Sequence, residues 1–94
     1  MVGTETYTIE GPDGDTDTLE LPAGLTSKLA DEGEDPTTVV AEVGLLSFAQ
    51  RSHAFVHHSQ GEVPDDLREI NDKMEELFEE RFGMTFGEAT GHQH

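Results

Sequence analysis

The sequence contains no cysteine and no tryptophan, and only five of its 94 residues are lysine or arginine. The absence of cysteine excludes disulfide bonds, thiolate metal sites and cysteine nucleophiles. Binding to the phosphate backbone of nucleic acid needs clustered basic residues, and these five are scattered, so we expect no direct binding of DNA or RNA. The longest largely apolar stretch, residues 39–49, is interrupted by Glu42 and is shorter than the roughly 20 residues that cross a membrane. We therefore expect a cytoplasmic protein with no membrane partner.

Acidic residues are abundant instead, and 21 Asp and Glu give the chain a net charge of −16. The charged fraction, 28%, is ordinary, so the unusual property is the sign of the charge and not its amount. Such a surface repels itself at low ionic strength, because the Debye length is about 30 Å at 0.01 M salt and about 3 Å at 1 M. The composition indicates a halophilic protein with a salt-adapted surface. A second interpretation is an acidic mimic of nucleic acid, whose partner would be a basic protein.

Charge divides the chain into three segments. Residues 1–35 carry ten acids and one base, and residues 62–94 carry ten acids and three bases. Residues 36–61 carry one of each, Glu42 and Arg51, so we expect this neutral segment to be shielded from solvent. The length permits one domain, in which an acidic hairpin with a short helix, a central helix, and an amphipathic helix with a tail follow in that order.

Alternating apolar and polar residues predict a β-hairpin at residues 5–10 and 16–21. The residues between these two segments are rich in glycine, proline and aspartate, as is typical of a turn. The apolar members are Tyr7, Ile9, Leu19 and Leu21. Because two strands alone are only marginally stable, this apolar face should pack on a helix or the edge should pair with another copy.

Four helical segments are expected after the hairpin. A short helix lies within residues 23–30, and a long one runs from Pro36 to about residue 58, before Gly61. The third is amphipathic and ends at Gly83, and its apolar residues are Leu67, Ile70, Met74, Leu77, Phe78 and Phe82. A capping box at residues 85–88 begins a last short turn. We predict an α+β fold: an N-terminal β-hairpin packed on about three helices, with a long central buried helix and a short C-terminal helical turn.

A pair of histidines near the end of the central helix is the candidate metal site. His53 and His57 are four residues apart, so both imidazoles project from one helix face and could share Zn²⁺ or Ni²⁺. A zinc site needs a third and usually a fourth ligand, which would have to come from His92, His94 or the same pair in a second subunit. The alternatives, with no cofactor, are a pair of histidines hydrogen-bonded at a buried or interfacial position and a pair that is exposed on the surface.

The central helix is apolar almost all round, which predicts self-association. The hairpin and the other helices can cover only part of it, and an uncovered apolar strip is typical of an interaction site. A two-fold pairing of this helix with its own copy is the simplest cover. The side of the helical wheel assigned to this interface carries Val39, Val43, Leu46, His53 and His57.

The sequence contains no catalytic motif. No serine lies in a Gly-x-Ser-x-Gly elbow, and the paired acids fit a solvated helix face. We therefore expect no enzymatic activity.

Two segments, Tyr7–Gly14 and Glu79–Glu88, resemble an uncharacterised family of small acidic proteins from halophilic archaea. The resemblance extends over essentially the full length, implies a high-salt cytoplasm and transfers no catalytic or binding residue. Together these observations predict a non-enzymatic homodimeric interaction or structural module, whose further protein partner the sequence does not name. A metal-binding protein that uses His53 and His57 at an oligomer interface and an acidic nucleic-acid mimic remain as alternatives.

Overall fold

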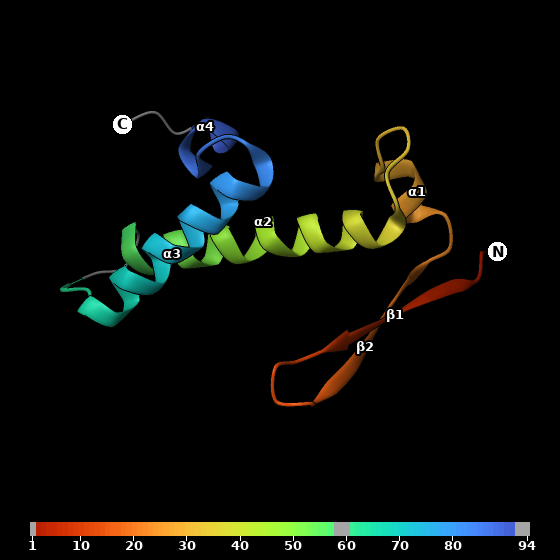
Figure 1. The fold of residues 1–94 in the computed structure, drawn as a ribbon, viewed down its shortest axis with the longest axis horizontal. Helices are drawn as coiled ribbons and strands as arrows, with labels where there is room; N and C mark the ends of the chain where they lie inside the picture. Colours follow the sequence, from red (N-terminus) through yellow and green to blue (C-terminus); the bar gives the residue numbers. More distant parts are fainter. Residues whose placement is uncertain (1, 58–60, 92–94) are drawn as a thin grey trace. The chain divides into compact units, whose positions relative to one another are not determined.

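The structure is a computed structural model that describes residues 2–57 and 61–91 (Figure 1). Its elements are β1 (Thr4–Glu10), β2 (Thr16–Pro22), α1 (Leu25–Leu29), α2 (Pro36–His57), α3 (Asp65–Phe82) and α4 (Phe86–Thr90). The predicted α+β fold, with an N-terminal hairpin, a long helix and a short C-terminal helix, is confirmed. Residue contacts divide the chain into two compact units, Met1–Ala41 and Glu42–His94, and α2 begins in the first and continues into the second.

The first unit is built on the antiparallel hairpin, in which Tyr7 faces Leu19. The turn closes when the N–H of Gly11 donates to the carbonyl oxygen of Asp15 at 2.8 Å. Gly14 has a φ of 87°, a backbone conformation that residues other than glycine adopt with difficulty. This explains why a glycine stands at this position of the turn. Each strand extends one residue beyond its expected bounds.

Helix α1 lies against the hairpin through hydrogen bonds near Tyr7. The Tyr7 hydroxyl and the Thr26 hydroxyl lie 3.1 Å apart, and Thr26 is buried. The N–H of Gly24 donates to Glu5 Oε1 at 2.9 Å, at the start of the same helix. The hairpin is thus held to the helix at its Tyr7 end, whereas Ile9, nearer the turn, remains exposed.

The second unit contains a small aromatic core. Ala49 of α2, Phe78 of α3 and Phe86 of α4 are buried, and Met74 and Phe82 pack against them. The rings of Phe78 and Phe86 meet edge to face with centroids 5.5 Å apart, an arrangement that stabilises aromatic pairs. Of the six apolar residues predicted for α3, Met74, Phe78 and Phe82 contribute to this core, whereas Ile70 and Leu77 are exposed.

The ends of α3 and α4 have local causes. Asp65 and Asp66 lie in the first turn of α3, where negative charge is favourable, and Gly83 ends that helix with a φ of 72°. Helix α4 begins with the predicted capping box between Thr85 and Glu88. Hydrogen bonds from the Thr85 N–H and then from its hydroxyl lower the pKa of the Glu88 carboxyl.

Helix α2 is less buried than expected. Val39 and Ala49 are its buried residues, whereas Val43, Phe48 and Phe55 are exposed. Neighbouring elements cover only part of the circumference of α2. Because this helix is apolar nearly all round, the uncovered part carries apolar side chains. Within residues 2–57 and 61–91, no helix is both long and apolar enough to cross a lipid bilayer.

Candidate functional site

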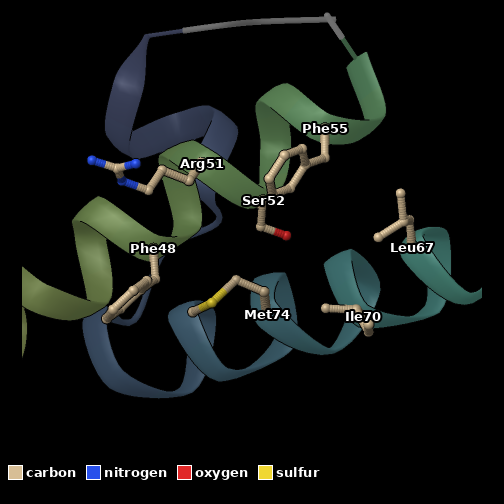
Figure 2. A pocket seen from close by; sticks show the side chains of 7 residues that line it. All are labelled: Phe48, Arg51, Ser52, Phe55, Leu67, Ile70 and Met74. Atoms are coloured by element: carbon tan, nitrogen blue, oxygen red, sulfur yellow. The ribbon is translucent and has the colours of Figure 1, made fainter. Parts of the chain in front are cut away.

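An apolar groove lies between α2 and α3 in the second unit (Figure 2). Its volume is about 470 Å³. It is lined by Phe48, Arg51, Ser52 and Phe55 from α2 and by Leu67, Ile70 and Met74 from α3. We call this feature the α2–α3 groove.

One hydrogen bond joins the two helices that form the groove, and a second within α3 orients its acceptor. The Ser52 hydroxyl donates to Asn71 Oδ1 at 2.7 Å, and Asn71 Nδ2 donates to Glu75 Oε2 at 3.2 Å. Asn71 is only 2% exposed, and a buried amide without partners would be costly. Asn71 is not among the site residues predicted from the sequence, and the signal for it is a polar residue on the apolar side of an amphipathic helix.

The apolar walls of the groove are open to solvent. Phe48 is 65% exposed, Phe55 is 61% exposed, and Ile70 is 60% exposed. Figure 2 shows the two phenylalanine side chains on the α2 side and Ile70, Leu67 and Met74 on the α3 side. A grouped apolar surface of this kind is typical of a binding site rather than of scattered surface residues.

Arg51 gives the groove its charge. Among the described residues that line the groove it is the one charged side chain, in a protein with 21 acids. Lys73 pairs with Glu76, and Arg81 lies 3.7 Å from Glu42, but Arg51 forms no ion pair within residues 2–57 and 61–91. The groove therefore combines aromatic side chains with an arginine, the residue types enriched at the centres of protein interfaces.

A second, smaller apolar hollow of about 260 Å³ lies elsewhere on the second unit. It is lined by Glu42, Val43, Leu46, Phe82, Met84 and Ala89. Val43 and Leu46 belong to the interface assigned from the sequence, and both are exposed. Val39 of that set is 5% exposed and offers almost no surface. The interface predicted from the sequence did not include Phe48 and Phe55, which line the α2–α3 groove.

The candidate metal ligands His53 and His57 lie side by side. Their rings stack with centroids 4.3 Å apart and an interplanar angle of 30°. The His53 ring also packs on Phe86 at 5.1 Å, so one histidine is half-buried against the core and the other is exposed. No group of three or more His, Asp or Glu side chains that could hold a metal occurs in the described part of the chain. His92 and His94, the other proposed ligands, lie outside it.

Comparison of the chain with curated proteins and with solved structures finds no match. A family model matches residues 1–94, the full length, in agreement with the resemblance to an uncharacterised family. The chain therefore belongs to DUF7545, a family of unknown function.

Proposed function

We propose that this protein is a non-enzymatic interaction module that works as a homodimer in a high-salt cytoplasm. The observation that carries the proposal is the cluster of Phe48, Phe55 and Ile70, three large apolar side chains that remain mostly exposed around one groove. Residues of this kind contribute to binding when a partner removes them from water.

The charge of the chain supports the high-salt setting. Two copies of a protein with a net charge of −16 repel each other strongly in dilute salt, which would prevent apolar surfaces from meeting. At about 1 M salt the Debye length is only about 3 Å, and short-range apolar contact then dominates. Dimerisation in this protein should therefore strengthen as salt is added.

Sedimentation equilibrium of the untagged chain in about 2 M KCl tests the proposal. At this salt concentration the Debye length is below about 3 Å. We expect a reversible monomer–dimer equilibrium whose dissociation constant increases as KCl is lowered. A folded monomer at all protein concentrations in high salt would contradict the proposal. Circular dichroism on the same samples distinguishes a monomer that is folded from a chain that has unfolded.

A metal-binding function rests on the stacked pair of His53 and His57. Two imidazoles one helical turn apart can provide two ligands to Zn²⁺ or Ni²⁺, and a second subunit could provide two more. This function requires that metal binding and dimerisation occur together. Sedimentation with and without added Zn²⁺ tests the link, because a dimer that is independent of metal argues against a shared site.

The alternative of an acidic nucleic-acid mimic rests on the exposed carboxylates of α3, which include Glu69, Asp72 and Glu76. A mimic would bind a basic DNA-binding protein and would release it as salt increases, because such binding depends on charge. The proposed homodimer has the opposite salt dependence. Affinity purification from lysate in low and in high salt, with the captured proteins identified, separates these two functions.

A further inference from the structure

We propose that the α2–α3 groove is the surface through which two copies pair, with α2 of each copy over α3 of the other and Arg51 of each copy bound by Asp66 and Glu69 of its partner. This inference rests on the proposed self-association and names the surface and the contacts that produce it. The alternative surface is the hollow lined by Val43 and Leu46.

The apolar part of the pairing comes from side chains on both helices of the groove. Phe48 and Phe55 are seven residues apart, which is about two helical turns, so they lie on the same side of α2. Ile70 lies across from them on α3 (Figure 2). Each copy thus presents an apolar ridge on α2 and an apolar residue on α3, and the smaller hollow offers no aromatic side chain that is comparably exposed.

The edges of the groove carry opposite charges. Arg51 lies on the α2 edge, and Figure 2 shows its side chain extending away from Ile70 and Met74. Asp66 and Glu69 precede Ile70 on α3 by four residues and one residue, and both are exposed. At about 100° per residue they lie on the side of Ile70 away from the buried Phe78, which is the outer edge of α3.

This distribution of charge selects one pairing. A two-fold that lays α2 over the α2 of the partner brings two Arg51 guanidinium groups together, and like charges in contact are unfavourable. A two-fold that lays α2 over the partner's α3 brings Arg51 to the acidic edge twice, once in each direction. A surface that is apolar at its centre, basic at one edge and acidic at the other is complementary to itself, as a two-fold interface requires.

Charge reversal on each edge tests the pairing in the full-length protein. The variants are Arg51→Glu and the double variant Asp66→Lys/Glu69→Lys, and their association is measured by sedimentation equilibrium at about 0.5 M KCl. This salt concentration screens the long-range repulsion between copies, whereas charged groups in direct contact still interact. We expect each variant alone to dimerise at least about tenfold more weakly than the wild type, because each puts like charges in contact. The double variant also makes the chain less acidic, which by itself would favour association, so a loss identifies the local contact.

Mixing the two variants provides the sharper result. In a one-to-one mixture, Glu at position 51 of one variant meets Lys at positions 66 and 69 of the other, and the opposite edge keeps the native pair of Arg51 with Asp66 and Glu69. We expect a heterodimer with an affinity within about threefold of the wild-type dimer, since both edges again carry opposite charges. Misfolded variants could not restore association in this way.

Two matched controls change the same charges outside the groove. Arg68→Glu and Asp72→Lys/Glu79→Lys alter exposed positions on other sides of α3, and we expect wild-type dimerisation from both. If wild type dimerises and Arg51→Glu behaves like Arg68→Glu, or if the mixed variants fail to associate, the groove pairing is wrong while the homodimer stands. If wild type is a folded monomer, both the pairing and the proposed function are overturned.

Discussion

Replacing Phe48 and Phe55 with serine should separate the dimer without unfolding the protein. The side chains are 65% and 61% exposed, so their removal takes little from the packing of a single copy. Full burial of a phenylalanine is worth about 1.5–3 kcal/mol, so burial of the exposed part contributes about 1–2 kcal/mol for each side chain. A dimer buries four of them, and the loss of about 4–8 kcal/mol corresponds to a dissociation constant at least about a thousandfold weaker.

Sedimentation equilibrium over a range of protein concentrations, with circular dichroism on the same samples, measures this effect. Val43→Ser is the matched control, because Val43 is also an exposed apolar residue of α2 but lines the smaller hollow. The expected result is a folded monomer for Phe48→Ser/Phe55→Ser and a dimer for Val43→Ser. The reasoning is refuted if the double variant dimerises as wild type does, and the reverse result would place the interface at Val43 and Leu46.

Three further outcomes are expected. Helical circular dichroism should decrease between about 2 M and about 0.05 M KCl, as the Debye length increases several-fold and self-repulsion grows; a melting temperature unchanged by salt would show that surface charge does not control stability. Because hydrogen bonds from Thr85 lower the pKa of Glu88, the capping box should stabilise the fold above the unfolded pKa of about 4.3 and lose this contribution as pH falls through the folded pKa. An NMR titration should find the Glu88 pKa below its ordinary value and raised by Thr85→Ala, and an equal pKa in both proteins would contradict this. If the histidines hold metal, His53→Ala and His57→Ala should each abolish zinc or nickel binding while His58→Ala should not, and calorimetry that finds no micromolar binding to the untagged wild type would end that hypothesis.

Local rules were sufficient to predict most of the secondary structure. Alternation located the hairpin around Tyr7, and the spacing of Leu67 to Phe82 located α3. That spacing found the core residue Phe78 but also included Ile70 and Leu77, which are exposed. Gly83 and the Thr85–Glu88 capping box fixed boundaries because each satisfies a backbone group that a helix end would otherwise leave without a partner.

The orientation of α2 could not be read in the same way. Periodicity identifies a buried face by contrast with a polar one, and a helix that is apolar nearly all round offers no such contrast. The side of α2 that faces the core is the side of Ala49, because Ala49 packs with Phe78 and Phe86. These two residues follow Ala49 by dozens of positions in the sequence. Phe48 and Phe55 are exposed because Ala49 packs on residues far along the chain. The sequence therefore predicted that α2 self-associates but did not show which of its sides is exposed to solvent.

The buried Asn71 has a consequence for the speed and selectivity of partner capture. A leucine in its place would tolerate several angles between α2 and α3. The Asn71 amide is oriented by Glu75 on its own helix and accepts from Ser52 on α2, and it keeps both bonds only when the two helices hold the arrangement that brings Ser52 to Asn71. The walls of the α2–α3 groove are thus held in place before a partner arrives. The entropy of ordering them is lost during folding and not during binding, which lowers the cost of each encounter and leaves shape and charge to discriminate among partners.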